Sequence, residues 1–106
     1  MNVRLKCMAV ACFAGLVASP MFAQSGADIF KVRCAMCHGM DGQASTPAGK
    51  IFKAASFTDP AIIKIPDDQR LEIVKNGKNK MPQFKNTLTD DQIKSVLAYI
   101  RTLEKK

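Results

Sequence analysis

The clearest hydrophobic pattern in the chain lies close to its C-terminus, where apolar residues recur at steps of three and four. The positions are Ile93, Val96, Leu97, Ile100 and Leu103. Residues with this spacing share one face of an α-helix, and that face is usually buried. Thr89 and Gln92 have the spacing of a capping box, so we expect the helix to begin directly after Thr89.

Three more helices are predicted from start and stop signals. Ser25 can cap a helix that covers Gly26 to about Cys37. Proline is favoured in the first turn, so Pro60 and Pro66 each indicate the beginning of a short helix. Asn76-Gly77 is a typical helix end and closes the second of these.

The rest of the pattern favours an all-α domain. Residues 39–50 contain the turn signals Asp41-Gly42 and Pro47-Ala48-Gly49 and are predicted to be a loop. No stretch alternates apolar and polar residues as a half-buried strand would, and no segment is repeated. A length of 106 residues suits one small domain.

A second apolar stretch, at the N-terminus, has a different character. Arg4 and Lys6 precede an uncharged run from Cys7 to Ala18, and Ala23 is a small residue at the position expected for cleavage. This is the pattern of a secretory signal peptide. We therefore predict that residues 1–23 are a signal peptide and that the remaining domain acts in the periplasm or another exported location.

Two other interpretations of this stretch remain open. The apolar run of about 12 residues could be a membrane anchor, but a bilayer core needs roughly 20. We therefore expect no stable membrane insertion after the signal is removed. Cys12 could be the first residue of a lipoprotein, although Ala9 to Cys12 lacks the usual leucine. Removal of Arg4 and Lys6 lowers the formal charge from +7 to +5.

The chemistry of the domain is indicated by Cys34-Ala35-Met36-Cys37-His38. This C-x-x-C-H spacing is typical of covalent haem attachment. Two thiols one helical turn apart can add to the two vinyl groups of one haem, and the histidine that follows can bind the iron. We therefore predict one haem c, attached through thioether bonds at Cys34 and Cys37, with His38 as an iron ligand.

Other uses of two cysteines and a histidine fit the sequence less well. A thioredoxin-like redox pair requires a strand before it, whereas the flanks here are predicted to be helical. A structural zinc site needs four ligands, and residues 24–106 contain two Cys and one His. A disulfide across so short a loop would be strained and would leave the histidine without a role.

A second iron ligand is expected from a distant part of the chain. Residues 24–106 contain three methionines, and two of them lie within or beside the attachment motif. The third, Met81, lies in a polar loop, where Pro82 restricts the backbone. A lone methionine is usually core filler, and Lys80 would be a competing ligand only after losing its proton. Because the chain also contains the C-x-x-C-H motif, we predict that Met81 binds the iron.

These motifs together resemble the small bacterial class I cytochromes c. The resemblance extends over essentially all of residues 24–106 and rests on Cys34 to His38, Met81-Pro82, Gly26 to Phe30, Asn76-Gly77 and a last helix with Tyr99. It implies an all-α fold of three to five helices wrapped around one haem. It also implies His/Met ligation of the iron, and one-electron transfer rather than enzymatic catalysis.

The resemblance further implies roles for single residues. Gly26 and Phe30 match positions at which the first helix meets the last one. Pro47 matches a proline whose carbonyl accepts the second N–H of the iron-bound histidine. Candidates for the haem pocket, any of which could instead be ordinary core, are Ile51, Phe52, Phe57, Ile62 and Ile65.

Charge indicates the class of partner. Six lysines fall in loops expected to surround the haem, namely Lys50, Lys53, Lys75, Lys78, Lys80 and Lys85. A basic ring would attract a redox partner with an acidic surface, although these lysines could instead form an ordinary solvated surface. Nucleic acid is not expected as a partner, because basic and aromatic residues are not interleaved. We expect the protein to be a monomer.

The sequence thus predicts an exported one-electron carrier. Two alternatives remain open. One is a haem-containing electron-entry subunit of a larger oxidoreductase. The other is a peroxidase-like or gas-binding haem protein, which would need an open sixth position at the iron.

Overall fold

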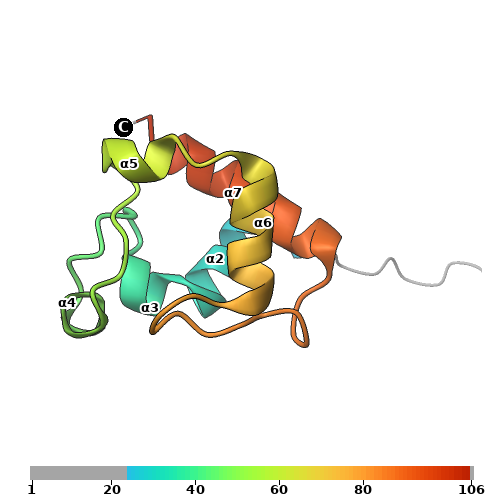
Figure 1. Ribbon diagram of the computed structural model, residues 1–106, viewed down its shortest axis with the longest axis horizontal. Coiled ribbons are helices and arrows are strands. Elements are labelled where there is room, and N and C mark those ends of the chain that lie inside the picture. The colour runs from blue at the N-terminus through green and yellow to red at the C-terminus, as the bar shows by residue number, and fades with distance from the viewer. Residues whose placement is uncertain (1–23, 106) are drawn as a thin grey trace, which may run out of the picture.

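The computed structural model describes residues 24–105, which contain six helices and no strand (Figure 1). In chain order they are α2 (Gly26–Arg33), α3 (Ala35–His38), α4 (Pro47–Phe52), α5 (Pro60–Ile63), α6 (Asp67–Asn76) and α7 (Asp90–Leu103). The all-α prediction is confirmed for this part of the chain, although it forms six helices where three to five were expected. The predicted signal peptide, residues 1–23, lies outside the described residues. None of the described helices is long and apolar enough to cross a membrane.

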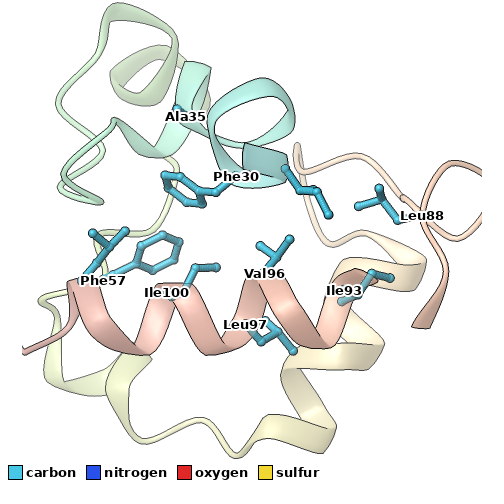
Figure 2. Close-up of a cluster of buried hydrophobic side chains, with 10 residues drawn as sticks. Phe30, Ala35, Phe57, Leu88, Ile93, Val96, Leu97 and Ile100 are labelled. Atoms are coloured by element: carbon cyan, nitrogen blue, oxygen red, sulfur yellow. The ribbon is translucent and has the colours of Figure 1, made fainter. Parts of the chain in front are cut away.

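The longest helix, α7, begins and packs as its sequence pattern predicts. The Thr89 hydroxyl accepts a hydrogen bond from the Gln92 N–H at 3.1 Å, and the Gln92 side chain accepts one from the Thr89 N–H at 2.8 Å. All five residues of the predicted apolar face are buried. Figure 2 shows Val96 and Ile100 on the side of α7 that faces Phe30.

The first described helix, α2, crosses α7 at very short range. A Cβ atom at Gly26 would lie only 2.1 Å from the backbone oxygen of Ser95 in α7, so glycine is required for this approach. One turn later the Phe30 ring lies 5.4 Å, centroid to centroid, from the ring of Tyr99. The predicted meeting of the first and last helices through Gly26 and Phe30 is therefore confirmed.

Two helix boundaries differ from the prediction. The expected helix from Gly26 to Cys37 is interrupted at Cys34, whose φ of −122° ends α2 before α3 begins. The predicted loop over residues 39–50 is partly wrong, because α4 begins at Pro47 and covers its end. Thr46 caps α4, accepting a hydrogen bond from the Gly49 N–H at 2.9 Å. A threonine cap followed by proline is typical of a helix start, but the sequence prediction assigned these residues to a turn.

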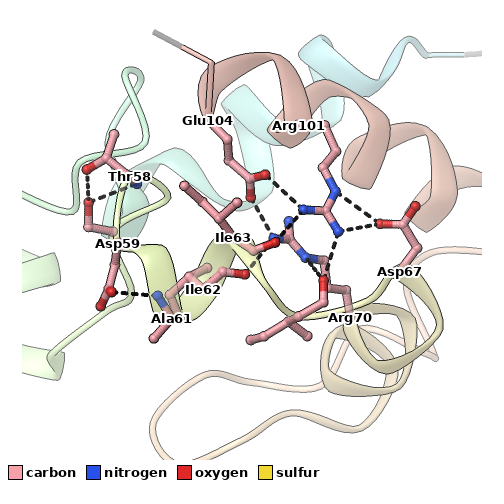
Figure 3. Close-up of polar contacts among 11 residues, drawn as sticks. Thr58, Asp59, Ala61, Ile62, Ile63, Asp67, Arg70, Arg101 and Glu104 are labelled. Atoms are coloured by element: carbon pink, nitrogen blue, oxygen red, sulfur yellow. Dashed lines mark hydrogen bonds and ion pairs between the residues drawn. The ribbon is translucent and has the colours of Figure 1, made fainter.

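A polar network joins the C-terminal part of α7 to the segment before α6 (Figure 3). Arg101 of α7 donates to the backbone oxygens of Ile63 and Ile65 at 2.9 and 2.8 Å. The same guanidinium forms an ion pair with Asp67, the first residue of α6, at 2.8 Å. These bonds hold the 63–67 segment against α7 and so position α6.

Candidate functional site

One cavity brings together the residues that the sequence motifs singled out. Its volume is about 460 Å³, and Cys34, Cys37, His38 and Met81 all line it. A volume of this size lies within the range of about 300–1,000 Å³ that is usual for ligand and cofactor sites. Cys34 lies at the junction of α2 and α3, Cys37 and His38 belong to α3, and Met81 comes from the loop after α6.

The cavity wall is mainly apolar and is built from the segments around it. Four of the five predicted pocket residues line it, namely Phe52, Phe57, Ile62 and Ile65. The prediction for Ile51 is wrong, because its side chain is 72% exposed and does not line the cavity. Helices α6 and α7 add apolar side chains that the motif analysis did not assign to a pocket, namely Ile73, Val74, Val96, Leu97 and Ile100.

His38 is held on two sides within this cavity. Its ring stacks on the ring of Phe57 with centroids 4.7 Å apart and an angle of 18° between the planes. Its Nδ1 lies 2.9 Å from the backbone oxygen of Ala55. A carbonyl only accepts hydrogen bonds, so Nδ1 carries the proton and donates it. Burial lowers the pKa of His38, opposed by this hydrogen bond. The imidazole is therefore neutral, and its Nε2 lone pair is free to bind a metal.

The hydrogen-bond partner of His38 corrects one prediction. The acceptor is the carbonyl of Ala55, not that of Pro47. Pro47 is the first residue of α4, so its carbonyl points along the helix axis. After α4 the chain turns back through Lys53, which adopts a left-handed conformation with φ of 55°, and this turn brings Ala55 beneath the imidazole. The role expected for Pro47 therefore falls to Ala55.

The Cys34 thiol lacks the lowered pKa of a redox-active cysteine. Cys34 and Cys37 are both free and half-buried. Burial raises the pKa of the Cys34 thiol to about 11, against a smaller opposing effect of Arg33. A catalytic thiol of the thioredoxin type needs a lowered pKa instead. Residues 24–105 also contain no group of three His, Cys, Asp or Glu side chains that could hold an ion such as zinc.

The loop that carries Met81 is held in place by its own backbone. The N–H of Lys78 donates to the oxygen of Met81 at 3.1 Å, and the N–H of Met81 donates to the oxygen of Lys78 at 2.9 Å. Asn79, within this tight turn, has a φ of 55°. Gly77 precedes it with a φ of 81°, and a Cβ atom there would lie 2.7 Å from the Met81 oxygen. The chain thus presents Met81 to the cavity in one defined position.

The charge around the cavity has one sign. Five cationic side chains line it and no Asp or Glu does; they are Arg33, Lys53, Arg70, Lys78 and Lys80. Three of these belong to the predicted ring of six lysines. Of the other three, Lys75 forms an ion pair with Asp90 at 3.5 Å, and Lys50 and Lys85 are exposed away from the cavity wall.

A second hollow lies between α6 and α7 and has no comparable chemistry. Its volume is about 510 Å³, and the side chains that line it are Asp67, Asp68, Leu71, Lys94, Leu97 and Ala98. It contains no histidine, cysteine or methionine. The cavity beside His38 is therefore the candidate site. A neutral imidazole, two free thiols, a thioether and an apolar wall fit a large, flat, metal-containing cofactor joined through sulfur.

Comparison with known proteins agrees with this chemistry. Residues 22–100 match the family model described as "Cytochrome C oxidase, cbb3-type, subunit III". Cytochrome c6 of Thermostichus vulcanus is 35% identical over 95 residues, which are 88% of this chain and 82% of that protein. Cytochrome c6 of Leptolyngbya boryana is 37% identical over 81 residues, 74% of this chain and 88% of the relative. A solved structure described as "KustC0563 c-type cytochrome" superposes with a TM-score of 0.70 at 28% identity, over 76% of this chain and 99% of that one.

Gly77→Ala should release Met81 from its defined position. The new Cβ would meet the Met81 oxygen in a backbone conformation that costs a residue other than glycine about 1–3 kcal/mol. We expect the amide N–H of Met81 to exchange with solvent about tenfold faster, while the amide of buried Ile100 keeps its rate. Gln83→Ala, exposed in the same loop, is the control and should leave both rates unchanged. Equal exchange at Met81 in wild type and Gly77→Ala would contradict the role of this glycine.

Proposed function

The chain belongs to the cytochrome c family, carries a covalently attached haem c and transfers electrons; from this premise we propose that its haem is held by Cys34, Cys37, His38 and Met81. The observation that carries the proposal is the convergence of these four side chains on one apolar cavity of about 460 Å³. Bound haem supplies an iron centre that gains and loses a single electron.

The surrounding residues favour this use of His38 and Met81. The Ala55 carbonyl and the Phe57 ring together fix the tautomer and the orientation of the imidazole. The Lys78–Met81 bridge limits the positions that the thioether can reach. Two protein ligands on the iron leave no open coordination position for a substrate or a gas. We therefore infer that the protein is a carrier rather than an enzyme.

The apolar wall has a further consequence for electron transfer. With haem in the cavity, the apolar wall would leave little room for water beside the four proposed attachment and ligand residues. An apolar environment and a thioether ligand both disfavour the additional positive charge of the oxidised state. The reduction potential should therefore be higher than that of a site with two histidine ligands.

We propose that the carrier acts outside the cytoplasm, in the periplasm or a comparable compartment. The support is the signal-peptide pattern of residues 1–23 together with the attachment motif. Its redox partner should present an acidic surface, because Lys53, Lys78 and Lys80 line the cavity without any carboxylate beside them.

A second candidate function is favoured by the family comparison. The matched family model is described by the name of an oxidase subunit, so the same site would also suit an electron-entry subunit of a larger oxidoreductase. The two functions differ in what accompanies the native protein. A free carrier purifies alone, whereas a subunit co-purifies with a large redox enzyme.

The attachment sites can be tested by replacing the thiols. Wild-type protein produced together with haem-attachment machinery should keep its haem through denaturing electrophoresis, because thioether bonds survive denaturation. The Cys34→Ala/Cys37→Ala double variant should lose all haem staining on the gel. Met36→Ala, within the same motif but 76% exposed, is the control and should stain fully. Haem that stays with the double variant would place the attachment elsewhere.

The role of Met81 can be tested by opening the coordination site. Met81→Ala should remove the weak red absorption of an iron–thioether bond, and reduced protein should then bind carbon monoxide rapidly at neutral pH. Wild type should not bind it rapidly. Met40→Ala is the matched control, since Met40 is 57% exposed and lies outside the cavity wall. A red band that persists in Met81→Ala would exclude Met81 as the ligand.

The docking proposal predicts a defined dependence on salt. Hexacyanoferrate(III), an anionic oxidant, serves as the probe. A variant with Lys53→Gln, Lys78→Gln and Lys80→Gln should be oxidised about tenfold more slowly than wild type at low ionic strength. Near 1 M salt the rates should converge, because the screening length falls to about 3 Å.

A matched variant separates local charge from net charge. Lys31→Gln, Lys64→Gln and Lys105→Gln remove the same charge from exposed positions that do not line the cavity. This variant should retain most of the wild-type rate, and the visible spectra of both variants should match wild type. If both sets of substitutions slowed oxidation equally, net charge alone would explain the effect, and a docking surface around the cavity would be contradicted.

A further inference from the structure

One charged residue of the cavity wall is buried. Arg70, on α6, is 6% exposed, and among residues 24–105 it is the one polar or charged residue that is buried as a whole, backbone and side chain together. The other four cations that line the cavity are exposed. Water and salt screen exposed charges strongly, whereas a charge in the low-dielectric interior acts over a longer distance. Arg70 is therefore the cavity-lining cation whose charge solvent screens least.

The guanidinium of Arg70 is held by three interactions (Figure 3). Its Nε donates to the oxygen of Ile65 at 3.0 Å, and its Nη2 donates to the oxygen of Ile62 at 2.7 Å. Nη2 also lies 2.7 Å from Oε2 of Glu104, whose side chain is 5% exposed. Among the described residues this oxygen has no hydrogen-bond partner apart from the ion pair. Glu104 is thus the counter-charge of Arg70, and both side chains are buried.

The two members of this ion pair are not equivalent toward the cavity. Arg70 lines the cavity, whereas Glu104 lies behind it at the end of α7 and does not. Glu104 is shared with Arg101, whose Nη1 lies 2.9 Å from Oε1 and whose side chain is 30% exposed. The cavity therefore has a fixed positive charge on its wall, and the compensating negative charge is set farther back.

We propose that Arg70 is a tuning residue that raises the reduction potential of the haem, and that Glu104 positions it and partly offsets its charge. The proposal rests on the proposed function, in which the haem occupies this cavity. The oxidised state has one more positive charge than the reduced state. A fixed cation on the wall disfavours that extra charge, and a carboxylate behind it has the opposite effect.

Spectroelectrochemical titration of the haem-loaded protein tests this pair, because the two substitutions should change the reduction potential in opposite directions. Arg70→Gln should shift the reduced-to-oxidised ratio at a fixed solution potential at least threefold toward oxidised protein. Threefold is equivalent to about 28 mV for one electron. Glu104→Gln should shift the ratio at least threefold toward reduced protein. A merely structural salt bridge would respond to both substitutions in the same direction, since each breaks the same contact.

Two further variants complete the experiment. Arg101→Gln removes a cation from the same Glu104 but away from the cavity wall, so its shift should be smaller than that of Arg70→Gln. Arg70→Lys keeps the charge, so its reduced-to-oxidised ratio should stay within threefold of the wild-type ratio. If Arg70→Gln does not fold, the ratios of Arg70→Lys and Glu104→Gln test the proposal in its place.

The inference would be overturned if Arg70→Gln and Glu104→Gln shifted the reduced-to-oxidised ratio in the same direction. It would also be overturned if neither variant shifted the ratio by as much as threefold. An Arg101→Gln shift as large as that of Arg70→Gln would overturn it as well. Failure of the proposed function would look different, because wild type itself would then show no reversible haem couple.

Discussion

The close crossing of α2 over α7 is the constraint on which the rest of the structure depends. With no side chain at Gly26, the two backbones approach closely enough for Phe30 to reach the core formed by α7. Because α2 leads directly into Cys34, this crossing also determines where the attachment motif begins. The break at Cys34 then turns α3 so that Cys37 and His38 line the same cavity. A packing contact without any chemistry of its own thereby positions the residues that carry the chemistry.

The site itself is assembled from segments that are far apart in the sequence. The Ala55–Phe57 segment returns beneath His38 after α4, and the loop after α6 brings Met81 to the same cavity. Each segment is held by backbone interactions, at Lys53 in one case and between Lys78 and Met81 in the other. Such rigidity suits electron transfer, because ligands that do not rearrange between oxidation states add little to the barrier.

Charge is organised on two levels around this cavity. In the proposed function, the exposed lysines at its edge attract redox partners, an effect that salt weakens. The proposed effect of the buried Arg70 is on the haem itself and is little affected by salt. The ion pairs of Arg70, Arg101 and Glu104 also connect the end of α7 to the segment before α6, so the same residues contribute to the fold and to the electrostatics of the site.

The sequence by itself determined the elements whose cause is local. The capping box at Thr89, the apolar face of α7 and the C-x-x-C-H motif all depend on residues within one or two helical turns, so their spacing is sufficient to identify them. The choice of Ala55 over Pro47, the stacking of Phe57 on His38 and the burial of Arg70 were decided only by the tertiary structure. These contacts join residues that are many positions apart, and their partners depend on how α4 bends the chain back and how α6 packs on α7. An arginine in an amphipathic helix is expected at the surface, and the carboxylate of Glu104 together with the backbone oxygens of Ile62 and Ile65 makes its burial possible.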